Sequence, residues 1–198
     1  MQVFNFNSYF LQRLLREKDF LEVFKFENEI IIIDGNNTSC PIQLNFTREN
    51  YKSKGIIFRN FFFDHGLTFD DVSIKSGIKF QNCTFANELL FYKVSSEEFD
   101  KELSEIPATI LFTECRFNAP LKILNSTFEN SIQIFNCNHS ANQFSIDKIK
   151  INKGGLEINN TPFHLLSFKG NVYAPPFFRP SKNREFSICV HVNSTGDL

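Results

Sequence analysis

The feature that most constrains this chain is a phrase of eleven residues that recurs along most of its length. The stretch from Gly55 to Asn87 contains it three times, as GIIFRNFFFDH, GLTFDDVSIKS and GIKFQNCTFAN. Positions two, four and nine are apolar, position seven is usually a small or medium-sized apolar residue, and position six is usually Asn or Asp. A fixed period over many copies is the signature of a repeat architecture, so it outweighs local secondary-structure propensity.

The same frame extends through the rest of the chain after slips of one residue. Further copies start at Thr109, Pro120, Ser131, Gln143 and Gly155, with a frayed copy at Leu165 and a broken copy at Glu88. Apolar residues two apart, then two apart again after an Asn, indicate two short strands joined by a bend. Cysteine returns at position seven of every second copy. Two copies, about twenty-two residues, are therefore expected to form one coil of a solenoid.

Equivalent positions of successive coils should stack at the parallel-strand spacing of about 4.8 Å, which predicts columns of similar side chains. Stacked flat or branched side chains in a narrow tube explain why the chain has 26 Phe, no Trp and one Met. The four predicted inward columns are Phe58, Phe80, Phe112, Ile134 and Ile158; Phe63, Phe85, Phe117, His139 and Phe163; Ile56, Ile78, Ile110, Ile132 and Leu156; and Phe69, Phe91, Ile123, Ile146 and Phe168.

Position six predicts the corners of the coil. Asn tolerates a left-handed backbone and can bond within its own turn, so an Asn column suits a sharp bend. That column comprises Asn60, Asn82, Asn136 and Asn160, and Glu114 interrupts it.

Each copy can also be divided into two short faces. The second face, such as Cys83-Thr84-Phe85-Ala86-Asn87, resembles the five-residue phrase of the pentapeptide-repeat proteins, in which a small residue precedes a central Leu or Phe by two places. The resemblance covers roughly residues 41–171. The chain departs from that family in two respects: its unit has eleven residues, and the Ala-Asp/Asn-Leu motif is mostly missing. It implies a right-handed, four-sided β-helix.

We therefore expect an all-β chain forming a right-handed parallel β-helix of about five coils in residues 41–171. Residues 1–40 are expected to cap the first coil, with a helix from Tyr9 to about Lys18 and a hairpin of LEVFKF and EIIIID. The repeat ends after Val172, so residues 172–198 are expected to form a C-terminal cap, a linker or an oligomerisation segment.

One insertion interrupts the repeat at residues 95–107. Ser95 with Glu98 matches a capping box, and Phe99, Leu103 and Ile106 share one helical face, which predicts a short helix that packs back on the flank of the coil. Five acids and one Lys give this segment a local charge of −4. It is interpreted as a solvated helix face or, alternatively, as a docking element carried by a rigid scaffold. The candidate interaction residues in it are Glu97, Glu98, Asp100 and Glu102.

Composition bounds the possible partners. A net charge of −1 argues against a strongly basic nucleic-acid binder and against the acidic surface that a protein imitating DNA requires. The chain has no apolar run long enough to span a membrane and no signal-peptide pattern at its start, which predicts a cytoplasmic protein without a membrane partner.

The residues that usually carry chemistry show no catalytic or metal-binding spacing. The five cysteines form no CxxC pattern, and three of them share one inward column, where they are interpreted as buried structural thiols. His139 replaces Phe in an inward column, so it is either a core histidine or a polar notch. Asp64, Asp70 and Asp71 are interpreted as turn residues, although β-helix polysaccharide enzymes use carboxylate pairs. No cofactor or metal is expected.

Two function classes remain. The first is a non-catalytic protein-binding or assembly module on a rigid β-helix, as the resemblance implies for many pentapeptide-repeat proteins. The alternative is a carbohydrate-active β-helix enzyme or, less well supported by the charge, a DNA-mimic inhibitor of a nucleic-acid enzyme. Because the last coil of a solenoid exposes apolar side chains, a homodimer through the C-terminal end is also expected, near Phe168, Phe177 and Phe178.

Overall fold

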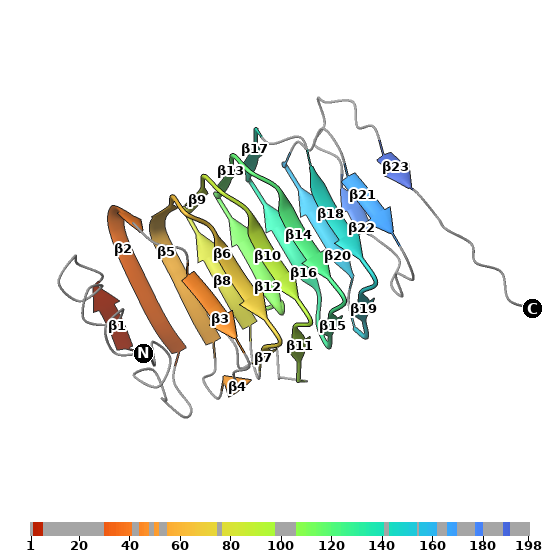
Figure 1. Ribbon diagram of the computed structural model, residues 1–198, viewed down its shortest axis with the longest axis horizontal. Coiled ribbons are helices and arrows are strands. Elements are labelled where there is room, and N and C mark those ends of the chain that lie inside the picture. Colours follow the sequence, from red (N-terminus) through yellow and green to blue (C-terminus); the bar gives the residue numbers. More distant parts are fainter. Residues whose placement is uncertain are drawn as a thin grey trace, which may run out of the picture.

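The computed structural model describes residues 2–5, 30–40, 44–47, 50–51, 55–74, 77–97, 106–140, 143–153, 155–161, 166–169, 177–179 and 188–190. Within these ranges the chain is all-β, with parallel strands stacked into a solenoid (Figure 1) and no helix. The predicted parallel β-helix is therefore confirmed. The predicted helix at 9–18 and the first strand of the predicted hairpin lie outside the described residues.

Each turn of the solenoid has four walls. The first wall contains the longest strands: β2 (Ile30–Cys40), β5 (Gly55–Phe63), β8 (Gly77–Gln81), β12 (Ile110–Thr113), β16 (Ile132–Phe135), β20 (Leu156–Asn159) and β22 (Phe177–Arg179). The second wall is short and combines the last residues of β2 and β5 with β9 (Thr84–Phe85), β13 (Arg116–Phe117) and β17 (Asn138–His139).

The other two walls repeat this alternation of a longer and a shorter strand. The third wall contains β3 (Leu44–Thr47), β6 (Leu67–Asp70), β10 (Leu89–Tyr92), β14 (Leu121–Leu124), β18 (Phe144–Asp147), β21 (Leu166–Lys169) and β23 (Ile188–Val190). The fourth wall contains β4 (Asn50–Tyr51), β7 (Ser73–Ile74), β11 (Ser95–Ser96), β15 (Thr127–Phe128) and β19 (Lys150–Ile151).

The predicted columns lie in register across these walls. Phe80 pairs with Phe58 on one side and with Phe112 on the other, and the ring centroids are 5.3 and 5.1 Å apart. Rings of neighbouring columns meet edge to face, as Phe80 and Phe85 do at 5.5 Å. Stacking along a column and edge-to-face contact between columns are the arrangements that aromatic rings favour. The interior is thus a packed core.

The corner prediction is also confirmed. Each described non-glycine residue with positive φ lies at position six of a repeat copy or at the equivalent bend of β2, with φ between 48° and 59°. These residues are Asn37, Asn60, Asp71, Asn82, Lys93, Glu114, Asn125, Asn136, Lys148 and Asn160. Position six therefore fixes a left-handed bend even where the residue is Lys or Glu.

Strands also stack beyond the expected ends of the repeat. Four turns, within residues 55–151, have all their walls described, and β2 adds a further rung below β5. β1 (Gln2–Asn5) pairs in parallel with β2, whose first residues were expected to form a hairpin strand. At the other end, β22 pairs with β20 and β23 pairs with β21, although the sequence pattern ends near Val172. The division of the chain into caps and a β-helix stays a prediction.

Candidate interaction surfaces

The start of the insertion differs from its prediction. Ser95 and Ser96 form strand β11, and the backbone N–H of Glu97 still donates to the carbonyl of Ile74 at 2.9 Å. A helix that begins at Ser95 is therefore wrong, because the strand ladder of the fourth wall holds these residues. Glu97 is exposed where the chain leaves the wall. Glu98, Asp100 and Glu102 lie outside the described residues.

The end of the insertion packs on the flank of the solenoid, as predicted for Ile106. Ile106 is fully buried and forms an outer apolar cluster with Ala108 and the outward-facing Ile57. It lies over Gly55, where an added Cβ would stand 2.7 Å from Cδ1 of Ile106. A Cβ on Gly77 would overlap Ile106 as well. Glycine at position one of two successive coils thus leaves space for the returning chain. The two glycines are visible in the repeat, but sequence reasoning did not connect them with the insertion.

A buried polar cluster joins the two ends of the insertion. The hydroxyls of Ser96 and Thr109 lie 3.3 Å apart, and the backbone N–H of Glu129 donates to Oγ of Ser96 at 2.8 Å. Oγ1 of Thr109 also exchanges hydrogen bonds with the backbone of Asn130 at 3.2 Å. Buried hydroxyls need partners, and here each end of the insertion supplies one to the other. The insertion therefore has a rigid base.

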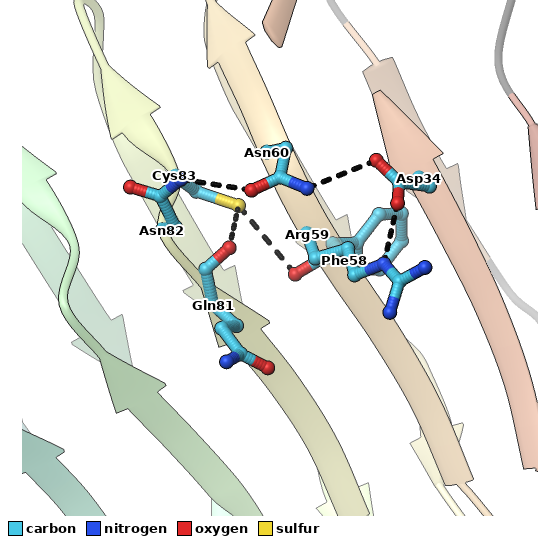
Figure 2. A network of polar contacts seen from close by, with 7 residues as sticks. All are labelled: Asp34, Phe58, Arg59, Asn60, Gln81, Asn82 and Cys83. Carbon is cyan, nitrogen blue, oxygen red and sulfur yellow. Dashed lines mark hydrogen bonds and ion pairs between the residues drawn. The ribbon is translucent and has the colours of Figure 1, made fainter. Parts of the chain in front are cut away.

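A second polar network runs along the corner between the first and second walls. We call its residues Asn60, Asn82, Glu114, Asn136 and Asn160 the first edge. Figure 2 shows its N-terminal part: Asn82 donates to Asn60 at 2.8 Å, and Asn60 donates to buried Asp34 at 3.1 Å. Nε of Arg59 also donates to Asp34, at 2.5 Å. Each carboxylate oxygen of Asp34 thus accepts a hydrogen bond, which compensates its burial.

The cysteine column follows directly after the first edge. Cys83, Cys115 and Cys137 are free and buried, and the backbone N–H of Cys115 donates to Sγ of Cys137 at 3.3 Å. Burial raises the pKa of the Cys115 and Cys137 thiols well above their ordinary value. These thiols therefore stay protonated at neutral pH, which fits the predicted structural role. Side chains of Cys40 and Cys189 lie outside the described set.

His139 lies in the core, where it continues the column of Phe117. Only 2% of His139 is exposed, and its ring centroid is 5.7 Å from that of Phe117, at a tilt of 33°. The tube is therefore closed at this position, and the alternative of a polar notch is wrong. Asp71 is an exposed corner residue with φ of 57°, whereas Asp70 ends strand β6 instead of forming a turn.

The register separates the two C-terminal candidates. Phe178 pairs with Ile158 and so continues the register of the inward column of Phe80, whereas Phe177 pairs with Glu157. The homodimer expected through this end of the chain stays a prediction.

No family model, no curated protein and no solved structure matches this chain. Across the described ranges, no group of three or more His, Cys, Asp and Glu side chains is placed to hold a metal ion. Nor does this described part contain a long apolar helix that could cross a membrane.

Proposed function

We propose that the protein is a non-catalytic binding module for another protein, built on a rigid β-helix. The observation that carries this proposal is the anchored insertion. Its exit is held by the strand ladder at Ser96, its return is held by fully buried Ile106, and a hydroxyl cluster links the two ends. Binding residues are often found on segments that leave a rigid scaffold and return to it.

The charge of the insertion favours a basic partner surface. The segment from Glu97 to Glu105 carries five acids and one Lys. Opposite charge at the rim of an interface speeds association and selects the partner more than it adds affinity. The module is therefore expected to bind faster and more tightly at low salt than at high salt.

The test is affinity capture with the purified chain, followed by reconstitution with the purified partner. A variant with Glu98→Gln, Asp100→Asn and Glu102→Gln should lower the affinity for a basic partner by about tenfold or more. The control variant Asp64→Asn and Glu114→Gln removes two exposed acids from other corners and should bind as the parent does. Equal binding by the two variants, or turnover of a polysaccharide by the parent, contradicts the proposal.

A further inference from the structure

The corner between the third and fourth walls carries lysines where the fold does not need them. We call its residues Asp71, Lys93, Asn125 and Lys148 the second edge, and all four have positive φ. Asn and Asp are the side chains that best tolerate this conformation, and a long side chain gains nothing there. Residues that break a local conformational rule are often functional.

The lysines form part of a grid of exposed donor groups. Strands β11, β15 and β19 place Ser95, Thr127 and Lys150 in register on the fourth wall, two residues after Lys93, Asn125 and Lys148. These six side chains, which we call the donor grid, span three successive rungs, and all are exposed. Each can donate a hydrogen bond, and none is a carboxylate.

The cations of the donor grid are not neutralised by the described residues. Lys122 on the third wall forms an ion pair with Glu88, whereas no described carboxylate forms one with Lys93, Lys148 or Lys150. Nζ of Lys93 instead lies 5.2 Å from the ring centroid of Tyr92, a cation–π contact that orients it. Three oriented or exposed cations beside two hydroxyls and an amide make a surface suited to carboxylates.

The spacing of the lysines selects among anionic ligands. Lys93 and Lys148 lie two rungs apart, which corresponds to about 10 Å along the solenoid axis. In a polyproline-II peptide, residues i and i+3 lie on one side and about 9.3 Å apart. Asp71, Asp147 and Glu129 border the donor grid and repel any anion. A nucleic acid has a charge at every nucleotide, so it fits less well than a peptide whose charges are spaced to match Lys93 and Lys148.

We infer that the donor grid binds an extended segment of a partner protein with a carboxylate at every third residue. The segment runs along the second edge, with successive carboxylates near Lys93 and Lys148 and backbone or side-chain acceptors near Ser95, Thr127 and Lys150. This inference rests on the proposed function as a protein-binding module, and it names the chemistry of a second contact, on the wall from which the insertion departs at Glu97.

The test uses a fluorescein-labelled (Glu-Pro-Pro)4 peptide and fluorescence anisotropy with the full chain. The parent should bind it, and raising the salt from about 50 to 300 mM should weaken binding because the contact is ionic. The variant with Lys93→Asn and Lys148→Asn should lose about tenfold in affinity. The same variant should melt at a higher temperature, because Asn suits the left-handed backbone. A structural role of these lysines predicts no such combination of weaker binding and greater stability.

Two further variants and two further probes make the result unambiguous. Glu114→Asn changes the same conformation on the first edge and should leave peptide binding unchanged. Lys150→Gln lies in a strand, so it should weaken binding without raising the melting temperature. Equal binding of (Gln-Pro-Pro)4 by the parent, unchanged binding in the double lysine variant, or tighter binding of a single-stranded oligonucleotide overturns the inference. If a captured partner binds the lysine variants as tightly as it binds the parent, the inference is overturned too, while the proposed function stands.

Discussion

The two left-handed edges of the solenoid have the same backbone and different side chains. On the first edge, three side-chain hydrogen bonds connect Asp34 to Asn60, Asn60 to Asn82, and Asn136 to Asn160. On the second edge the described residues form no such ladder, although the backbone bonds continue, as from Lys93 N–H to Leu124 C=O at 3.1 Å. The comparison shows that the bend itself needs only the backbone ladder. Side-chain bonding is an addition that one edge has and the other lacks.

The largest expected effect tests whether the interior, rather than either edge, holds the tube together. Phe80→Ala removes a ring that stacks on Phe58 and Phe112 and is fully buried. The lost burial and the cavity should lower the free energy of unfolding by about 3–5 kcal/mol, measured by chemical denaturation. Phe62→Ala is the matched control, because Phe62 is 37% exposed on the second wall. A similar loss in both variants contradicts the idea of an interior-dominated fold.

The first edge itself can be compared with the second by one substitution in each. Asn82→Ala removes the left-handed preference and also the hydrogen bond to Asn60. Asn125→Ala removes only the preference. The expected losses in the free energy of unfolding are about 2–3 and about 1–2 kcal/mol, respectively. Denaturation midpoints under one set of conditions measure the difference. Equal losses mean that the ladder contributes nothing.

The sequence predicted what depends on the repeat and missed what depends on departures from it. The frame alone gave the registers of Phe58, Phe80 and Phe112 and the bend at Asn82, because stacking forces equivalent positions together. It did not predict that Ile106 packs on Gly55, since contact between an insertion and a distant coil leaves no periodic signal. Nor did it single out Lys93, since the repeat pattern predicts Asn or Asp at position six.

Strands that the repeat pattern does not predict show a second limit of sequence-based prediction. Ser95 and Ser96 have good N-cap chemistry, yet the neighbouring strands β7 and β15 hold them in β11. Strand pairing across coils therefore decides the conformation of these two residues. Likewise, β22 and β23 extend the stack although their residues do not follow the eleven-residue phrase. A backbone rung needs only extended geometry, whereas the phrase records which side chains fill the interior.

The two edges should also differ in their response to alkaline pH. Position seven after the first edge holds Cys115 and Cys137, whose thiol pKa is raised by burial, whereas Val72, Val94, Ser126 and Ile149 follow the second. Unfolded thiols ionise near pH 8.5, while the folded thiols stay protonated to higher pH. Unfolding therefore releases protons above pH 8.5, and the stability present at lower pH is lost as the pH rises.

Two such thiols should lower the free energy of unfolding by about 2 kcal/mol between pH 8.5 and 9.5. Denaturation curves of the parent and of the variant Cys115→Ser, Cys137→Ser measure this slope. Ser126 occupies the equivalent position after the second edge and is buried, so serine is a suitable replacement. The variant should lose most of the pH dependence even if its stability at pH 7 is lower. A parent whose stability is constant over this interval would contradict the buried protonated thiols.

The smallest expected effect concerns the interruption of the first edge by Glu114. Its φ is 56°, and it lies between Asn82 and Asn136, where the ladder of side-chain hydrogen bonds is broken. In both formed links of the Asn column, the amide of one coil donates to the carbonyl oxygen of the coil before it. A carboxylate can accept from Asn136 but cannot donate to Asn82. Glu114→Asn supplies that donor and also a side chain that suits the bend.

Glu114→Asn should therefore raise the free energy of unfolding by about 1 kcal/mol or slightly more, which corresponds to a rise of about 2–4 °C in the melting temperature. Lys148→Asn on the second edge improves the same conformation without a ladder to complete, so its gain should be smaller. The difference between the two gains measures what the hydrogen-bonded column adds. If Lys148→Asn stabilises the protein as much as Glu114→Asn does, the Asn column stabilises the fold only through its backbone conformation, and the contrast between the edges reduces to their charge.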